Sequence, residues 1–503
     1  MGRIFSAGCA RLSPVLSSFL FLALFTLALP AAADRYREGQ GMLSWPQEEM
    51  VQAMELYVPR RLAELDVPGA AIAVVRDGQL VYEGTFGLAD TWNGAPVTKK
   101  TLFEAASLGK SVSAYGILIL AREGFLPLDA PLQKALPRPW PMEGGDVSAL
   151  TARQLLTHTS GLGNNTAAPD SELAFAPGRK FSYSGIGYMY LQHAVEEIAA
   201  ADFQTVMRDL VFAPFGMEES YFALPPASLG ALARGYVPVL QPVLIILLPF
   251  LALSLIFIGA GWALYRFALD RPKYYWTDAL PPAGLAFVTA VALVWPYIGT
   301  GRMPFILIVT IAYLAALAVL YFIVSFLAGV LGFYGPRDGT LSRGDEGSGR
   351  LVSAVSFLIA IGLSVALLSQ HIPVPRMPAG ELNAANSLRS TAGDLGRFVA
   401  GFIQARRLGT EWRERMVSET VPVRDGMEWG LGIGMREAEG RKTYWQWGAN
   451  PGFASLMVID PARRGGVVIL TNSSDGDKLA QEVAGQVLGL QPGWELPAAA
   501  VPF

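Results

Sequence analysis

Ser107 and Lys110 form a Ser-x-x-Lys pattern within residues 106–111. At the start of a helix, side chains three residues apart lie on one face. A serine hydroxyl is a weak nucleophile until a neighbouring group takes its proton, and a lysine can do so when burial lowers the pKa of its amine. Amides at the helix N-terminus would stabilise the developing negative charge. The pattern alone also fits a solvated serine and lysine, so its partners decide its meaning.

Further motifs accompany this pair along the chain. They are Leu155-Leu156-Thr157-His158-Thr159-Ser160-Gly161-Leu162, Tyr183-Ser184-Gly185, Ser390-Thr391-Ala392-Gly393-Asp394-Leu395 and Gly448-Ala449-Asn450-Pro451-Gly452-Phe453. Together they resemble the active-site serine penicillin-recognising family, which includes class C β-lactamases, D,D-peptidases and related esterases. The resemblance implies an α/β (α+β) fold of the β-lactamase/transpeptidase type. In this fold, an antiparallel five-stranded sheet is flanked by helices and joined by a helical subdomain.

The resemblance also implies a role for each motif residue. Ser107 would attack a carbonyl group and form an acyl-enzyme, and Lys110 would take part in proton transfer. Tyr183 would act as a phenolate-like base or a proton relay, which requires that Lys110 lower the tyrosine pKa from its usual value of about 10. The backbone amides of Ser107 and Ala449 would form the oxyanion hole. Outside this set, Tyr183 would be interpreted as a packed aromatic residue.

Two positions depart from the family pattern. Gly185 stands where many relatives have Asn, and Gln446-Trp447-Gly448 replaces the Lys/His-Thr/Gly-Gly strand motif that borders the substrate. Either Gln446 or, after a shift of one residue, Trp447 occupies the position of the cation. That cation helps to bind the carboxylate of β-lactams and D-Ala-D-Ala peptides. Its absence favours an esterase-like or peptidase-like hydrolase over an efficient β-lactamase.

Other functional classes find little support in the residues. The chain has one cysteine, Cys9, and three histidines, so we expect no metal site and no cofactor. His158 lies in a turn motif and is expected to bond to the backbone rather than to catalyse. Glu104 replaces the first glycine that a phosphate-binding loop would need before Gly109. The net charge of −3 without a basic run gives no indication of nucleic-acid binding.

The elements expected around these residues mix helices and strands. The expected strands are Ala70–Arg76, Leu80–Gly87, Gly430–Arg436, Thr443–Gln446, Ala454–Asp460 and Val467–Thr471. The expected helices cover Gln47–Leu65, the stretch from Ser107 through Leu120, Gly187–Ala199 and Asp477–Leu488, and Thr391 caps a further helix. Four β-like runs near the C-terminus indicate an antiparallel sheet on which the last helix packs.

A central apolar segment separates the two halves of this pattern. Apolar residues make up 52% of the 503 residues, charged residues only 16%, and mean hydropathy is +0.36. Four apolar runs follow one another, at roughly 242–265, 283–298, 304–331 and 351–369, each near the ~20 residues that cross a bilayer. Buried core helices are the alternative. We predict a four-helix transmembrane insert at 239–372, which acts as an anchor because its spans carry no ionisable residue near their centres.

The N-terminus and the charges around the spans predict an orientation. Residues 1–33 have the basic start, apolar run and Ala-rich end of a cleaved signal peptide. Arg and Lys are concentrated in the first and third connections between the spans, which assigns those connections to the cytoplasm. We therefore predict a multi-pass protein of the inner (cytoplasmic) membrane. Its two-part catalytic domain, residues 34–238 and 373–503, would face the periplasm.

The sequence thus predicts a membrane-anchored periplasmic serine hydrolase. Its substrate would be an ester, an amide or a D-amino-acid peptide, small or peptidoglycan-like, and its other partner would be the lipid bilayer. Two alternatives stay open. One is a penicillin-type sensor, which would need a partner protein in the membrane because the predicted cytoplasmic loops are short. The other is a catalytically inactive ligand-binding module.

Overall fold

A computed structural model of the chain describes residues 41–140, 147–166, 172–238, 371–374, 382–424, 426–490 and 494. Within these ranges, no helix has the length and apolar character that crossing a membrane requires. The predicted signal peptide and all four predicted spans lie outside the described residues. Both therefore stay predictions.

A nine-stranded antiparallel sheet forms the centre of the fold, in the order β3-β2-β1-β13-β12-β11-β10-β9-β8. Its strands are β1 (Gly69–Arg76), β2 (Gln79–Asp90), β3 (Ala95–Pro96), β8 (Val421–Arg424), β9 (Met427–Trp429), β10 (Gly434–Ala438), β11 (Arg441–Asn450), β12 (Phe453–Asp460) and β13 (Gly465–Thr471). The predicted antiparallel sheet is confirmed, but the predicted number of five strands was wrong. The short strands β3, β8 and β9 extend the two edges, and their polar and Pro-containing sequences gave no strand signal.

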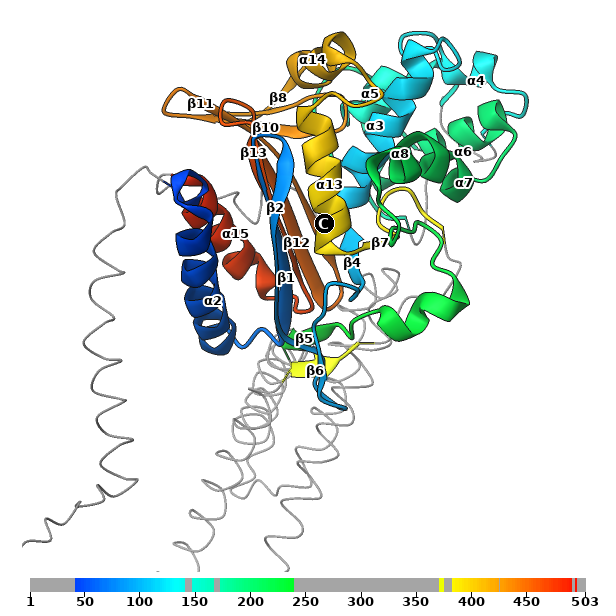
Figure 1. The fold of residues 1–503 in the computed structure, drawn as a ribbon. Coiled ribbons are helices and arrows are strands. Elements are labelled where there is room, and N and C mark those ends of the chain that lie inside the picture. The colour runs from blue at the N-terminus through cyan, green and yellow to red at the C-terminus, as the bar shows by residue number, and fades with distance from the viewer. Residues whose placement is uncertain are drawn as a thin grey trace, which may run out of the picture.

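Helices cover both faces of this sheet (Figure 1). The helices α2 (Gln47–Glu64) and α15 (Gly476–Leu488) pack on one face, and α13 (Ala392–Ile403) packs on the other beside α3 (Leu108–Arg122). Side chains of β1 alternate between two apolar clusters, with Ile72 under α2 and α15 and Ala73 under α13. Because successive strand residues point to opposite faces, a sheet buried on both sides has nearly continuous apolar strands.

Further α-helices and two strand pairs lie outside the nine-stranded sheet and its covering helices. They are α4 (Leu132–Ala135), α5 (Ala152–Leu156), α6 (Gly185–Ala199), α7 (Phe203–Met207), α8 (Ala213–Phe215) and α14 (Thr410–Ser418), and the paired strands β4 (Phe103–Ala106) with β7 (Leu388–Ser390) and β5 (Tyr236–Pro238) with β6 (His371–Pro373). Helices α4 to α8 gather beside α3 on the side of α13 (Figure 1). They correspond to the predicted helical subdomain.

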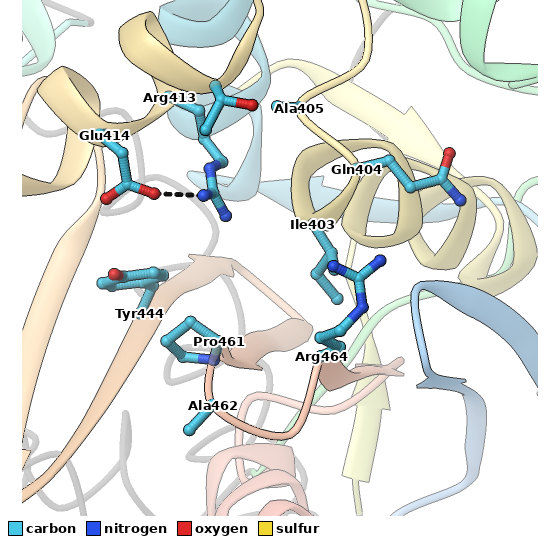
Figure 2. A pocket seen from close by; sticks show the side chains of 10 residues that line it. Ile403, Gln404, Ala405, Arg413, Glu414, Tyr444, Pro461, Ala462 and Arg464 are labelled. Carbon is cyan, nitrogen blue, oxygen red and sulfur yellow. Dashed lines mark hydrogen bonds and ion pairs between the residues drawn. The ribbon is translucent and has the colours of Figure 1, made fainter.

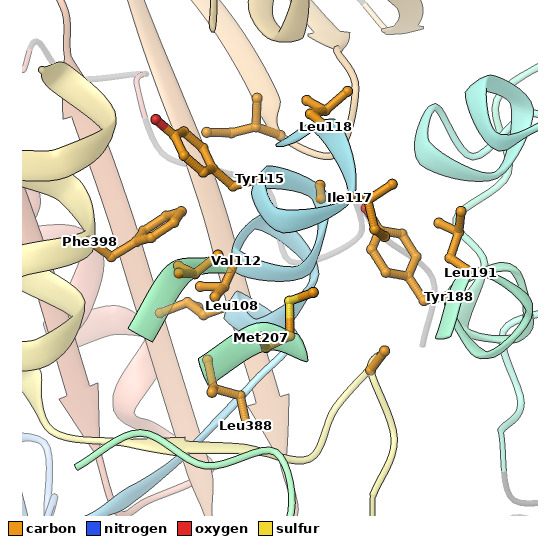
Figure 3. Close-up of a cluster of buried hydrophobic side chains, with 14 of the residues drawn as sticks. Leu108, Val112, Tyr115, Ile117, Leu118, Tyr188, Leu191, Met207, Leu388 and Phe398 are labelled. Carbon is orange, nitrogen blue, oxygen red and sulfur yellow. The ribbon is translucent and has the colours of Figure 1, made fainter. Parts of the chain in front are cut away.

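Helix α3 is the centre of the larger apolar cluster. Its residues from Leu108 to Ala121 are all buried. Figure 3 shows Val112 and Tyr115 directed toward Phe398 of α13, with Tyr188 of α6 beside the helix. A helix that is apolar on all sides has to be enclosed by other elements. This enclosure fixes the position of the helix N-terminus, where Ser107 lies.

Most predicted element boundaries agree with the structure, but one strand was misplaced. The helices α2, α6 and α15 begin and end within two residues of the expected bounds. The Thr391 hydroxyl accepts from the Asp394 amide and caps α13, as predicted. The predicted strand Gly430–Arg436 was wrong in its first half. Gly432 has a φ of 91°, which extended backbone does not allow, so β10 begins only at Gly434.

The strands β5 and β6 mark the two ends of the predicted insert. They pair antiparallel, with Tyr236 opposite Pro373 and Pro238 opposite His371. The chain therefore leaves the described structure at residue 238 and returns beside the same point at residue 371. The predicted division into domains is compatible with this pairing and stays a prediction.

Candidate active site

Ser107 lies where the chain turns from β4 into α3. It is the N-cap residue of α3, and the preceding Ala106 has a φ of 50°. This left-handed conformation costs a non-glycine residue roughly 1–2 kcal/mol. Strain of this kind concentrates at functional sites, where the surrounding structure holds it in place. The turn presents Ser107 at the helix N-terminus, where the helix dipole stabilises negative charge.

Lys110 lies within hydrogen-bond distance of the Ser107 hydroxyl. Its Nζ atom is 2.9 Å from Ser107 Oγ and 2.7 Å from the backbone oxygen of Ala385. The lysine is only 2% exposed. Burial lowers the pKa of its amine to about 7, because an ammonium group loses its hydration in this environment. A neutral lysine amine can therefore exist at neutral pH and can take the proton of Ser107.

Tyr183 completes the predicted trio but carries a different charge state from the one expected. Its hydroxyl bonds to Ser107 and accepts from Gln446 Nε2 at 3.3 Å. Burial raises the tyrosine pKa to about 12, against the opposing effect of these two hydrogen bonds. A phenolate would need a lowered pKa. At neutral pH Tyr183 is therefore a neutral phenol that can donate or relay a proton, which leaves Lys110 as the candidate base.

His158 accepts hydrogen bonds from the two residues that flank Tyr183 in the chain. The amide of Ser182 donates to the His158 backbone oxygen at 2.7 Å, and the amide of Ser184 donates to His158 Nδ1 at 3.0 Å. The imidazole ring lies 4.2 Å from the Tyr183 ring, centroid to centroid. Burial and the charge of Lys110 lower the histidine pKa well below its usual value, so the ring stays neutral. His158 is thus a backbone-bonded residue, as expected from the sequence.

The strand β11 places Gln446 beside Tyr183 and Ser111. Gln446 is fully buried, donates to Tyr183, and its Oε1 lies 3.4 Å from the hydroxyl of Ser111. Trp447 projects from the other side of the strand, since successive strand residues alternate, and it is partly exposed. Of the two candidates for the position of the family's cation, Gln446 is the one that contacts Tyr183 and Ser111. Its correspondence to that cation stays a prediction.

Gly448 lets β11 pass close to the Ser107 turn. A Cβ atom at this position would lie 2.4 Å from the oxygen of Ala105 and 2.9 Å from the amide nitrogen of Ser107. Only glycine fits such an approach. The next residue, Ala449, continues the same strand beside the turn. The structure thus brings the two predicted oxyanion-hole residues to adjacent segments.

Gly185 departs from the family pattern for a steric reason. A Cβ atom at Gly185 would lie 2.6 Å from Thr166 Cγ2 and 2.7 Å from the backbone oxygen of Asn164. The same position is 3.2 Å from Asn164 Oδ1. The segment that contains Asn164 therefore leaves no room for a side chain at position 185.

Sequence reasoning missed two contributors to the site. The first is the carbonyl of Ala385, which accepts from Lys110 through its backbone, so no residue type could reveal it. Asn383 holds this residue, because its Oδ1 accepts from the Ala385 amide at 2.8 Å. The second is Ser111, which donates to the Gly432 oxygen at 2.8 Å. Its helical spacing of four residues from Ser107 was the available signal.

A separate open cleft of about 660 Å³ lies at the C-terminal end of α13 (Figure 2). Arg413 and Glu414 of α14, Tyr444 of β11 and Arg464 line it. Figure 2 shows the ion pair between Arg413 and Glu414 at its rim. Ser107 lies near the opposite end of α13, because β4 pairs with β7 just before that helix begins. The cleft and the serine are therefore distinct places in the molecule.

A comparison with known protein families identifies the family of this chain. The family model described as Beta-lactamase matches residues 54–293 and 337–490, well over half of the chain. The chain belongs to the β-lactamase family. Homologues of this family include serine hydrolases, so the predicted enzyme family is confirmed. The match is interrupted between residues 293 and 337, inside the segment for which we predict membrane spans.

Curated relatives resemble one part of this β-lactamase-family chain. Esterase EstB of Burkholderia gladioli is 31% identical over 199 residues, which are 34% of this chain and 50% of that protein. Penicillin-binding protein 4* of Bacillus subtilis (strain 168) is 27% identical over 191 residues, 33% of this chain and 41% of that protein. The matched stretch thus spans half the length of these relatives or less.

Solved structures show the same fold. The octameric penicillin-binding protein homologue from Pyrococcus abyssi has a TM-score of 0.55 at 19% identity, covering 89% of this chain and 79% of that one. D-alanine carboxypeptidase AmpC from Burkholderia cenocepacia has a TM-score of 0.53 at 19% identity, covering 88% of this chain and 100% of that one. The predicted β-lactamase/transpeptidase-like α/β fold is confirmed.

Proposed function

We propose that this protein is a serine hydrolase that forms an acyl-enzyme at Ser107. The observation that carries the proposal is the 2.9 Å separation of Lys110 Nζ from Ser107 Oγ, in a site that lowers the lysine pKa to about 7. Neutral Lys110 accepts the hydroxyl proton as Oγ bonds to the carbonyl carbon of the substrate. The carbonyl of Ala385 holds the amine in place during this transfer.

The remaining steps use groups that surround the serine. The amides of Ser107 and Ala449 bind the oxygen that becomes negative in the tetrahedral intermediate. When the intermediate collapses, the leaving group departs with the proton that Lys110 holds, and Tyr183 relays it because its phenol bonds to Ser107. Water then attacks the acyl carbon, gives one proton to Lys110, and releases the acid as Ser107 regains its hydrogen.

We propose an ester, an amide or a D-amino-acid peptide as the substrate class. One relative is named an esterase and another a penicillin-binding protein, which supports acyl-group chemistry of this kind. We assign neutral Gln446 to the position of the family's cation, a choice that its contacts with Tyr183 and Ser111 support. Without a positive charge at this position, the site attracts a substrate carboxylate less strongly. Esters and amides without a carboxylate near Gln446 are therefore favoured as substrates over β-lactams.

We also propose that the protein is anchored in the inner membrane with this domain on the periplasmic side. The four apolar runs and the predicted signal peptide support the anchor. The pairing of β5 with β6 supports it as well, because both ends of the apolar segment leave the domain at one point.

Labelling with a serine-reactive fluorophosphonate tests the catalytic proposal. We expect the wild type to be labelled at Ser107 and Ser107→Ala to be unlabelled. Ser113→Ala is the matched control, because Ser113 is buried in the same helix and its hydroxyl has no hydrogen-bond partner among the described residues. Equal labelling of wild type and Ser107→Ala would refute the proposal. Labelling without turnover of any ester, amide or peptide would favour the sensor or binding-module alternative.

A further inference from the structure

Trp92 is an exposed aromatic residue in the turn between β2 and β3. Its side chain is 88% exposed, more than any other large apolar residue in the described ranges. A single exposed apolar residue is common on protein surfaces. Trp92 differs because of the segment to which its turn is attached.

Polar contacts fasten this turn to β5. The Tyr236 hydroxyl accepts from the Thr91 amide at 2.8 Å and donates to Asp90 Oδ1 at 3.2 Å. The same carboxylate oxygen accepts from the Trp92 amide at 2.9 Å, and Arg234 pairs with the other oxygen of Asp90. Trp92 is therefore held at a fixed place relative to β5.

The strand β5 is also where the chain leaves for its apolar segment. Pro238 ends β5, and the first apolar run begins at about residue 242. Four residues of extended chain reach at most about 14 Å. The last apolar run ends at about residue 369, and β6 begins at His371. Both connections to the apolar segment thus start at the edge that carries Trp92, and Figure 1 shows β5, β6 and the β2–β3 turn at one edge of the domain.

We infer that this edge rests on the surface of the lipid bilayer and that Trp92 lies in the headgroup layer. The inference rests on the proposed membrane anchor and deepens it. Tryptophan suits this layer because its ring is apolar and its N–H is a hydrogen-bond donor. Lys99 and Lys100 are exposed just after β3 and add positive charge toward anionic headgroups.

The same edge lies close to the reactive serine. The amide of Tyr236 donates to the oxygen of Gly452 at 3.2 Å, two residues beyond the end of β11. The chain from Gly452 back to Gly448 spans at most about 13 Å. Gly448 contacts the Ser107 turn. A domain that rests on this edge holds its active site near the bilayer surface, within reach of acyl groups on membrane-bound molecules.

Depth-dependent fluorescence quenching on the full-length chain tests the inference. Cys9 is the only cysteine, so Cys9→Ser provides a background in which Trp92→Cys carries a single fluorophore. Phe125→Cys is the matched control, because Phe125 is a 61% exposed aromatic residue beyond the far end of α3. The proteins are reconstituted in phosphatidylcholine–phosphatidylglycerol vesicles with nitroxide-labelled headgroups. Labelling of Ser107 by fluorophosphonate verifies that each variant is folded.

We expect quenching at position 92 to exceed quenching at position 125 at least threefold. Equal and weak quenching at both positions, in protein that floats with the vesicles, would overturn the placement of Trp92 and leave the anchor intact. Protein that does not float with the vesicles would overturn the anchor itself, and the inference with it.

Discussion

Two regions at opposite ends of α13 each contain a cationic side chain, and they differ in the partners and the solvent exposure of that side chain. In the open cleft, Arg413 pairs with Glu414, a carboxylate whose side chain is 55% exposed. At the serine, Lys110 is 2% exposed, and its hydrogen bonds go to a hydroxyl and a carbonyl. In the cleft a carboxylate that water can reach balances the cation, whereas at the serine no carboxylate among the described residues pairs with Lys110 and burial removes water from its ammonium group.

This difference determines which chemistry each cation can take part in. A paired surface charge contributes about 0–1 kcal/mol to stability. A buried amine has a shifted pKa, and each pKa unit corresponds to about 1.4 kcal/mol between its two protonation states. A neutral amine beside Ser107 can accept a proton, so desolvation of Lys110 is what the proposed chemistry requires.

Removing each cation in turn should give the largest contrast. We expect Lys110→Met to lower ester hydrolysis by about 1,000-fold, within the range for loss of a general base. Arg413→Met, in the cleft, should stay within twofold of wild type. Steady-state assays of both variants provide the measurement. Comparable losses in the two would contradict the account.

The same Lys110→Met variant should be more stable than the wild type. Between the folded-state pKa of about 7 and the unfolded value of about 10.5, the unfolded chain binds the extra proton, so stability rises with pH in this window. At pH 7 the buried amine therefore destabilises the fold. Its removal should raise the free energy of unfolding by about 2 kcal/mol, after the loss of two hydrogen bonds. Urea unfolding at pH 7 and pH 10 measures this, and the gain should shrink at pH 10.

Gly448→Ala should reduce catalysis without touching a catalytic side chain. The added methyl group would press on the oxygen of Ala105 and the amide of Ser107. A displacement of about 1 Å at a reacting group can cost roughly 100-fold in rate. Gly485→Ala is the control, since nothing lies within 4 Å of a Cβ atom at Gly485 in α15. The control should keep full activity; an equally active Gly448→Ala would show that the close approach is unimportant.

His158 should be replaceable by asparagine but not by alanine. Asparagine tolerates the φ of 56° and offers an acceptor near the position of Nδ1 for the Ser184 amide. We expect His158→Ala to lower kcat about tenfold with little change in KM, because Tyr183 loses its support. His158→Asn should recover most of that loss. If neither variant alters kcat, His158 does not position the tyrosine.

The smallest effect is expected from Glu414→Gln at the rim of the cleft. This exchange breaks an ion pair whose carboxylate is exposed, so stability should change by less than about 1 kcal/mol. Ester hydrolysis should be unchanged. A large loss of activity would mean that the cleft takes part in the reaction, which would break the contrast between the two regions.

The sequence predicted the parts of this site that depend on residue type. Ser107, Lys110 and Tyr183 come together as predicted, because each belongs to a motif whose chemistry requires that side chain. The capped start of α13 at Thr391 and most of the central strands were likewise local patterns. Local patterns survive in the fold when tertiary packing agrees with them.

The rest could not be predicted because it depends on three-dimensional surroundings. The pKa of Tyr183 rises rather than falls, since burial outweighs its hydrogen bonds and the neighbouring lysine is itself desolvated. The carbonyl of Ala385 reaches Lys110 from 275 residues away. The crowding of Gly185 by Asn164 is a contact between the start of α6 and a loop. None of these features can be predicted from the types or spacing of nearby residues in the sequence.

The pH dependence of acylation at Ser107 tests the central claim most directly. With an uncharged ester in single turnover, the rate should rise about tenfold per pH unit in acid, as expected for loss of one proton. The midpoint should lie at about 7, where Lys110 becomes neutral, and the rate should stay level to about pH 10, since the Tyr183 pKa is about 12. A rate that is independent of pH from 5 to 9, or that falls as pH rises through 7, would contradict the account.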